Sequence, residues 1–208
     1  RLIDNAYGIY DGKKVIEGQE MVIKTNTLSE DEFRYFRFFH FLLQMMWSKR
    51  WYYDYLKFLQ GYEIHPVSVF DKIVEKCKKD HGEMGKLYLE FMKTYDELEK
   101  FESFDDLQKY FEKDSNFNQL KNESYGKLNM LYTYKTILNH REAFNKLLIE
   151  IAKEYAKNLD LDVNYFTDVC EEILLFQNTK FVQIDNEWNI NPQITETFKY
   201  DVLEWKEN

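Results

Sequence analysis

The longest apolar pattern of the chain lies between residues 29 and 47, SEDEFRYFRFFHFLLQMMW. Apolar and aromatic side chains recur there every three or four residues and cover most of the circumference of a helix. Ser29 followed by Glu32 is a capping-box pair, which marks the start of this helix. One apolar stripe contains Phe33, Phe36, His40, Leu43 and Trp47, and the other contains Tyr35, Phe38, Phe39, Leu42 and Met46. The pattern predicts a long buried helix that is either the centre of a helical domain or half of an interface with something larger.

Further helical patterns follow this stretch along the chain. They cover residues 51–59, 66 to about 81, 83–101, 103–112 and 124–158, and a last one begins with Asp162 or Asn164 as its cap. We expect a break at residues 48–50 and a kink near Asn139 and His140. Residues 114–123 are polar and rich in asparagine, which predicts a loop.

The two ends of the chain have strand-like patterns instead. Asp11 and Gly12 tolerate positive φ angles and predict a tight hairpin turn, and residues 21–25 read as a further strand. Near the other end, Phe181, Ile184 and residues 185–188 suggest a short hairpin, and residues 195–202 alternate like a strand. We expect the two ends to pair into a small sheet.

These patterns predict a mainly α fold, an irregular helical bundle around a buried central helix with a small β element from the N- and C-terminal segments. Only seven glycines and two prolines occur among 208 residues, which fits long helices. We expect one accessory domain over residues 1–208, with a hairpin and strand segment at 1–27, the bundle at 28–178 and a strand-like tail at 179–208. Because the chain starts at Arg1 in what reads as a strand-rich passage, we interpret it as a piece of a longer protein.

Charge and hydropathy narrow the possible partners. The chain carries 37 acidic and 28 basic residues, a net charge of −9, without a basic cluster, so nucleic acid is not an expected partner. No stretch of 18 apolar residues without charge occurs and no signal peptide opens the chain, so we expect no membrane partner and a cytoplasmic location.

Few residues suggest metal or redox chemistry. Cys77 and Cys170 are 93 positions apart and lie among apolar neighbours at helical spacing, which predicts two buried free thiols. Two thiols cannot complete a cysteine zinc site or hold an iron–sulfur cluster. The four histidines lack a second ligand at a metal-binding spacing. We therefore predict no metal or cofactor site and no catalytic residue within this chain.

A polar ridge on the central helix is the one candidate site. Arg34, Arg37, His40 and Gln44 follow one another at helical spacing among apolar residues. The simpler interpretation is a hydrogen-bonded histidine beside a structural arginine, because buried polar groups are usually paired for stability. The functional alternative is that these four residues contact a substrate or a neighbouring domain.

Three segments together resemble a known family. They are residues 7–10 (YGIY) with 20–29 (EMVIKTNTLS), then residues 36–40 (FRFFH) with Gln44 and Trp47, and finally residues 198–205 (FKYDVLEW). These segments are similar to the C-terminal region of cobalamin-binding radical S-adenosylmethionine enzymes.

The resemblance implies a larger enzyme around this chain. In that family this region follows a cobalamin-binding domain and a partial TIM-type barrel, so both domains would be partners here. The whole enzyme would use a 4Fe-4S cluster, S-adenosylmethionine and cobalamin, and would generate a 5′-deoxyadenosyl radical, often for methyl transfer. Three closely spaced cysteines are required for the cluster, and this chain has only Cys77 and Cys170.

We therefore expect a C-terminal accessory domain that is not catalytic alone, that packs on the barrel and that helps to enclose the substrate. The alternative is a stand-alone helical protein–protein interaction module that uses exposed tyrosine and tryptophan side chains as contact anchors.

Overall fold

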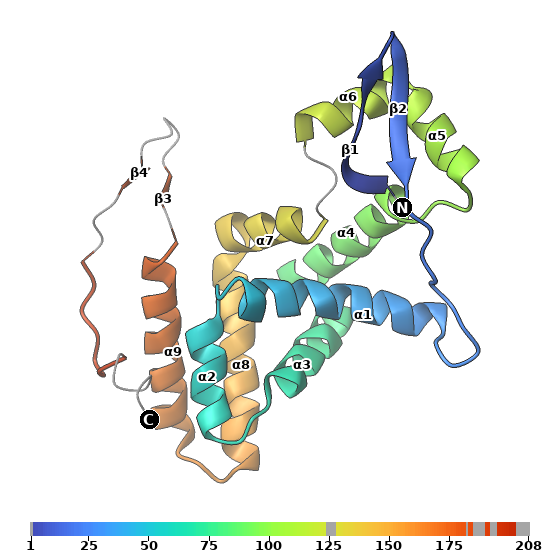
Figure 1. Ribbon diagram of the computed structural model, residues 1–208. Coiled ribbons are helices and arrows are strands. Elements are labelled where there is room, and N and C mark those ends of the chain that lie inside the picture. The colour runs from blue at the N-terminus through green and yellow to red at the C-terminus, as the bar shows by residue number, and fades with distance from the viewer. Residues whose placement is uncertain (1, 124–127, 182, 185–189, 192–194, 203–208) are drawn as a thin grey trace.

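The computed structural model describes residues 2–123, 128–181, 183–184, 190–191 and 195–202. This part of the chain is mainly α-helical with a small β component, as the periodicity predicts (Figure 1). Three predicted features lie partly outside the described residues: the turn residues 185–188 of the expected C-terminal hairpin, the first residues of the helix at 124–158, and the last residues of the 198–205 segment.

The bounds of the elements are as follows. The α-helices are α1 (Glu30–Leu42), α2 (Tyr53–Gly61), α3 (Pro66–Lys79), α4 (Glu83–Leu98), α5 (Phe104–Glu112), α6 (Asp114–Glu123), α7 (Leu128–Asn139), α8 (Arg141–Asn158) and α9 (Val163–Thr179). A π-helical segment, η1 (Leu43–Ser48), continues α1, and the strands are β1 (Leu2–Tyr10), β2 (Lys13–Gly18), β3 (Gln183–Ile184) and β4 (Ile190–Asn191).

Helix α1 begins with the predicted capping box. The Ser29 hydroxyl accepts a hydrogen bond from the Glu32 amide at 3.2 Å, and the Ser29 amide donates to Glu32 Oε2 at 2.7 Å. Two backbone N–H groups at the helix start are satisfied in this way, and three acidic residues in the first turn complement the helix dipole.

One face of α1 forms the centre of the main core. Helix α1 crosses the bundle and contacts α3, α4 and α7 (Figure 1). The Phe38 ring lies 5.3 Å from that of Phe41 and 5.1 Å from that of Phe91 on α4, and all three are fully buried. The prediction of a helix with two buried stripes is only partly right, because Phe36 is 53% exposed and His40 is also exposed. Phe36 and His40 therefore lie on the outward face of α1 and η1, whereas Phe33, Leu43 and Trp47 are half-buried there and pack against the main core.

The predicted breaks between helices are confirmed. The helix that begins at Ser29 stops at Ser48, and Arg50 has a φ angle of 60°, which turns the chain into α2. Pro66 occupies the first turn of α3, where its missing N–H is not needed. Residue His140 separates α7 from α8, and the Asp162 side chain caps α9 by accepting from the Tyr165 amide at 3.0 Å.

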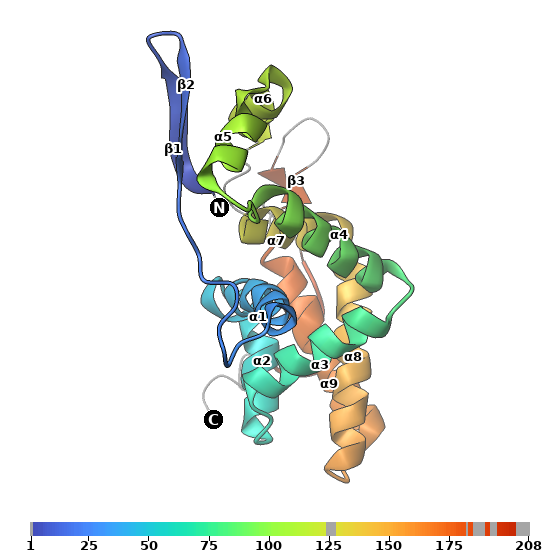
Figure 2. The same ribbon diagram turned by 90° about the vertical axis from the view of Figure 1, so that its right-hand side faces the viewer.

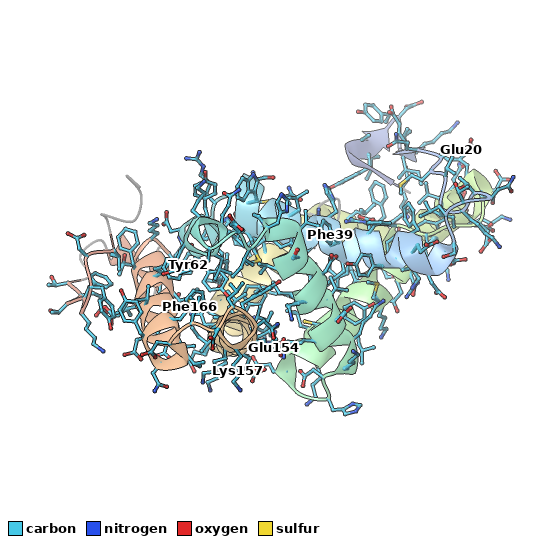
Figure 3. All side chains as sticks on the ribbon, turned by 90° about the horizontal axis from the view of Figure 1, so that it is seen from below. Glu20, Phe39, Tyr62, Glu154, Lys157 and Phe166 are labelled. Atoms are coloured by element: carbon cyan, nitrogen blue, oxygen red, sulfur yellow. The ribbon has the colours of Figure 1, made fainter. Side chains whose placement is uncertain are left out.

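The bundle is closed by packing between α2, α8 and α9. Side chains fill the space between these helices (Figure 3), and the ring of Tyr62 at the end of α2 meets that of Phe166 on α9 edge to face at 5.0 Å. The Tyr55 hydroxyl, fully buried on α2, donates to the Leu148 carbonyl of α8 at 2.8 Å. Burying this hydroxyl is favourable only because it has an acceptor.

The prediction of a loop at residues 114–123 is wrong, because these residues form α6. Phe117 and Leu120 lie three positions apart, so both point to one side of the helix, and both are fully buried. They complete a second core with Ile16, Leu107 and Phe111. Two buried side chains at helical spacing therefore outweigh the asparagine-rich composition of this segment.

The strand predictions need a larger correction. The Asp11–Gly12 turn is confirmed, with φ angles of 48° and 73° that join β1 to β2 in an antiparallel hairpin. Within the described ranges the two ends of the chain do not pair, because β1 pairs with β2 and β3 pairs with β4 in separate sheets. The antiparallel pairing of β3 with β4 confirms the short hairpin expected near the C-terminal end. Among the described residues, neither 21–25 nor 195–202 forms a strand. The tail packs on α9 instead, where Lys199 Nζ lies 2.7 Å from Asp168 Oδ2.

The described residues form two separate hydrophobic cores. The small lobe consists of β1, β2, α5 and α6, that is residues 2–18 and 104–123, and it is built on the second core. The helical bundle contains the other helices and the main core. Figures 1 and 2 show the small lobe at one end of the molecule, with the hairpin lying against α5 and α6.

Candidate functional site

The four residues of the predicted ridge do not act as one group. Arg37, His40 and Gln44 meet around Asn129, the second residue of α7, which is buried. Arg34 points to α4, where it pairs with Asp96 and lies 5.8 Å from the centre of the Tyr95 ring. The hydrogen bond to Asp96 raises the pKa of Arg34. We use the name Arg37 network for Arg37, His40, Gln44, Glu99 and Asn129.

Arg37 is held by a two-pronged ion pair. Its Nε donates to Glu99 Oε2 at 2.8 Å and its Nη2 donates to Glu99 Oε1 at 2.7 Å. Its Nη1 donates to Asn129 Oδ1 at 2.7 Å, so each of the three guanidinium nitrogens donates a hydrogen bond. The side chains of Arg37 and Glu99 are only 10% and 14% exposed. This geometry fixes the end of α4 against α1 and engages the donors that a bound anion would need.

Asn129 links the arginine to the outer half of the ridge. Its Nδ2 donates to Gln44 Oε1 at 2.6 Å and lies 3.2 Å from His40 Nδ1, which accepts when the imidazole proton is on Nε2. The hydrogen-bonding capacity of the buried amide is therefore used on both sides. The contacts support the simpler interpretation for Arg37, whereas His40 reaches the outward face of α1.

Sequence reasoning missed Glu99 and Asn129. Asn129 stands in the apolar stripe of α7 beside Leu128, Tyr132 and Ile137, and a lone amide in such a stripe indicates a buried polar contact. Glu99 has no such signal, since an acidic residue just after the end of an amphipathic helix usually faces solvent. Only its proximity to Arg37 explains its burial.

The remaining histidines have local roles. His65 precedes α3, and its Nδ1 accepts a hydrogen bond from the Val67 amide at 3.2 Å, which caps the helix. His140 Nδ1 lies 2.7 Å from Glu83 Oε1 and joins the start of α8 to the start of α4. His81 is exposed in the turn before α4.

The two cysteines lie in different helices of the described bundle. Cys77 lies in α3 and Cys170 in α9, both are buried and free, and a cluster needs more thiolates than these two. No group of three or more histidine, cysteine, aspartate or glutamate side chains is arranged to hold a metal ion within the described ranges.

The burial of the two thiols leads to a prediction about their reactivity. Burial raises the pKa of Cys77 to about 12 and also raises the pKa of Cys170, so the reactive thiolate is disfavoured in the folded protein. We expect a thiol reagent such as DTNB at pH 8 to label neither cysteine in the folded protein and both after unfolding in guanidinium chloride. Rapid labelling of the folded chain, located by mass spectrometry, would contradict the packing of α3 or α9.

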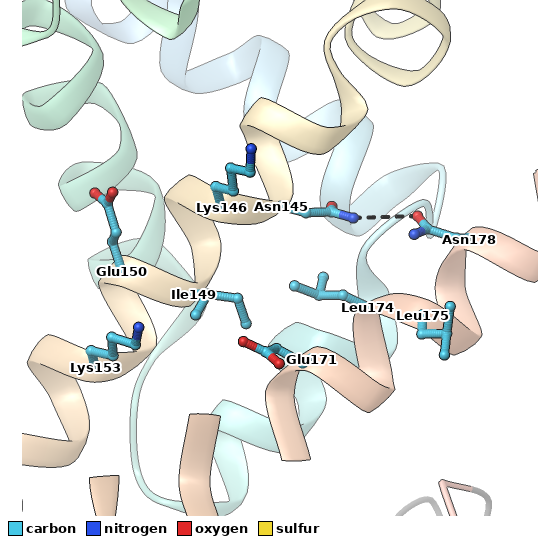
Figure 4. A pocket seen from close by; sticks show the side chains of 9 residues that line it. All are labelled: Asn145, Lys146, Ile149, Glu150, Lys153, Glu171, Leu174, Leu175 and Asn178. Atoms are coloured by element: carbon cyan, nitrogen blue, oxygen red, sulfur yellow. Dashed lines mark hydrogen bonds between the residues drawn. The ribbon is translucent and has the colours of Figure 1, made fainter. Parts of the chain in front are cut away.

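A shallow groove between α8 and α9 has a volume of about 500 Å³. Ile149 and Leu174 form its apolar floor, and charged side chains including Lys153 and Glu171 form its rim (Figure 4). At one end the Asn145 amide faces Asn178 across the groove, 3.4 Å from its Oδ1 (Figure 4). Charges of both signs surround the floor, so the groove selects neither an anion nor a cation.

A second cleft, of about 310 Å³, lies where the small lobe meets the bundle. Residues 18–21 with Ile23 line one side, and residues 99–104 with Leu107 line the other. Glu99 therefore belongs both to the Arg37 network and to the wall of this cleft.

Comparisons with protein-family models, with curated proteins and with solved structures give no match for this chain. None of the helices in the described part of the chain has the length and apolar character needed to cross a membrane.

Proposed function

We propose that this chain is the C-terminal accessory domain of a larger enzyme similar to the cobalamin-binding radical S-adenosylmethionine enzymes. In this proposal it packs on the catalytic barrel of that enzyme and is not catalytic alone. Its two buried free thiols are consistent with a reducing compartment, and we place the enzyme in the cytoplasm.

The outward face of α1 and η1 carries the proposal. Phe36 and His40 are exposed on this face, and Phe33, Leu43 and Trp47 lie half-buried beside them and pack against the main core. Phe36 is 53% exposed, and residues 19–28, which lead into α1, include Val22 at 70% exposed. Apolar side chains that gather at the surface of one face are typical of a contact with another domain. Phe36, His40 and Trp47, like residues 20–28, belong to the segments on which the family resemblance rests.

The contacts of the Arg37 network refine the role of the ridge. Because the donors of Arg37 are bonded to Glu99 and Asn129, we assign Arg37 to positioning α1 against α4 and α7. His40, which is exposed on the same face as Phe36, is the ridge residue that we expect to contact the barrel or a substrate. Gln44 orients His40 through their common partner Asn129.

The coding sequence upstream of Arg1 and a binding experiment test the proposal. We expect that sequence to encode three closely spaced cysteines within a barrel domain. The upstream polypeptide, produced separately, should bind residues 1–208 in isothermal titration calorimetry. Phe36→Glu should weaken this binding about tenfold or more, because it places a charge in an apolar contact. Leu89→Glu, a change at an exposed leucine of α4, is the matched control and should not.

The second candidate is a stand-alone interaction module, which the same outward face also favours. An open reading frame that begins with a methionine just before Arg1, together with self-association that Phe36→Glu abolishes in sedimentation experiments, would support this candidate. The same two results would overturn the accessory-domain proposal. An upstream cysteine triplet without measurable binding would leave the family assignment standing and reject the docking face.

A further inference from the structure

The small lobe is nearly independent of the bundle in its packing. Its core residues Ile16, Leu107, Phe111, Phe117 and Leu120 are all contributed by β2, α5 and α6. The elements of the lobe pack chiefly on one another. Each lobe therefore has its own source of hydrophobic stabilisation and can keep its internal structure when the other moves.

Polar contacts within the small lobe follow the same division. The Tyr7 hydroxyl donates to the Leu120 carbonyl at 2.9 Å, and Lys14 Nζ lies 2.6 Å from Asp114 Oδ1, so both bonds join the hairpin to α6. Asn116 Nδ2 donates to the Tyr110 carbonyl at 2.8 Å and ties α6 to α5. These contacts hold the hairpin and the two helices of the small lobe to one another.

Two of the chain connections between the lobes are described, and both lack regular structure. Residues 19–28 form neither helix nor strand, and residues 99–103 separate the end of α4 from the start of α5. Phe101 is the hinge-side member of the second core, with its ring 5.5 Å from that of Tyr110 and 6.1 Å from that of Phe111. Short irregular connections between separately packed bodies are where hinge motions concentrate.

The bundle holds the start of the second connection through charged side chains. Glu99, the first residue after α4, forms the buried ion pair with Arg37, and Lys100 pairs with Glu30 at the start of α1. These two pairs fix residues 99 and 100 to α1. Phe101 packs against the second core and Ser103 caps α5, so Glu102 is the residue between the part of this connection held by the bundle and the part held by the small lobe. Removing the Arg37–Glu99 pair would lengthen the free connection, because Glu99 would no longer be attached to α1.

We propose that the small lobe is a lid that moves as one body about residues 19–28 and Glu102, and that the Arg37–Glu99 ion pair is the latch that sets its closed position. The 310 Å³ cleft is lined by the two connections, by Gly18, Phe104 and Leu107 of the small lobe, and by Glu99 and Lys100. Because Glu99 and Lys100 are held to α1, the motion of the lobe changes the width of this cleft. Arg37 is then a positioning residue that acts on the cleft through Glu99. This inference goes beyond the proposed accessory role, because it concerns residues 1–208 alone and needs no partner.

Distance measurements between spin labels test the lid in the isolated chain. One label at Lys109→Cys on α5 and another at Lys153→Cys on α8 report on the lobe-to-bundle distance, and both positions are exposed. Labels at Lys13→Cys and Lys109→Cys report on the small lobe alone. The native cysteines are buried and stay unlabelled. Each pair is measured by double electron–electron resonance in the otherwise unchanged chain and in Arg37→Met, Glu99→Gln and Arg34→Met backgrounds.

We expect a narrow lobe-to-bundle distribution in the otherwise unchanged chain and a distribution about twice as wide or more in Arg37→Met and in Glu99→Gln. Arg34→Met is the matched control, since Arg34 also joins α1 to α4 but one turn before the connection. Arg34→Met should leave the width of the lobe-to-bundle distribution unchanged. For the label pair within the small lobe, the width should be the same in all variants. Equal widths with and without Arg37, or equal broadening by Arg34→Met, would overturn the latch. Broadening within the small lobe would overturn its motion as one body.

Discussion

Replacing Phe38 by alanine is expected to lower the free energy of unfolding by about 3–5 kcal/mol, the usual range for removing a large aromatic ring from a core. Phe38 is fully buried at the centre of α1, and its ring also meets that of Tyr88 at 4.9 Å. The ring contacts three aromatic neighbours on α1 and α4, so its loss leaves a cavity that rigid neighbours fill poorly. Urea unfolding followed by circular dichroism measures the effect.

Phe36→Ala is the matched control for this prediction. It removes the same ring from the same helix two positions earlier, where the side chain is 53% exposed. We expect a change within about 0.5 kcal/mol, as for surface substitutions in general. Equal losses for the two variants would show that the outward face of α1 is buried in solution and would contradict the orientation of the helix.

Replacing Arg37 by methionine is expected to cost about 3 kcal/mol of stability, because it leaves the largely buried Glu99 carboxylate without its partner. Asn129 also loses the donor to its Oδ1. Arg34→Met should cost about 1 kcal/mol or less, since that ion pair is more exposed, with side chains 27% and 42% accessible. The free energies of unfolding in urea give both values.

A double-mutant cycle separates two contributions to the lost stability: the interaction energy between Arg37 and Glu99, and the cost of leaving the Glu99 carboxylate buried without a partner. The variant Arg37→Met with Glu99→Leu should recover much of the stability lost in Arg37→Met, because no unpaired carboxylate remains. A double variant as unstable as the sum of the two single ones would show that Arg37 and Glu99 do not interact and would contradict the network around Asn129.

The positions of most helices and breaks follow from residues close together in the chain. The Ser29 capping box, Pro66 at the start of α3, the Asp162 cap of α9 and the Asp11–Gly12 turn each act over a few positions, so all were predictable. For residues 114–123 the polar, asparagine-rich composition led to the wrong prediction of a loop. Residues 114–123 form α6 because a second core exists for Phe117 and Leu120 to join.

The candidate site was predictable only in part. The ridge of Arg37, His40 and Gln44 follows from helical spacing, and the structure brings these three residues together. Their partners come from far along the chain, because Glu99 is 62 positions and Asn129 is 92 positions from Arg37. No local pattern indicates which distant residue completes a buried polar group.

By itself the sequence determined that this protein is mainly α-helical, where most of its helices begin and end, and that a heavily apolar helix follows Ser29. Local hydrogen bonds, caps and the 3.6-residue period are enough for these features. The tertiary structure alone decided which residues of that helix face outward, which strands pair, and that the fold has two cores joined near Glu99. These features depend on which surfaces bury one another across long separations in the chain, and a periodic pattern states how much surface is apolar but not what covers it.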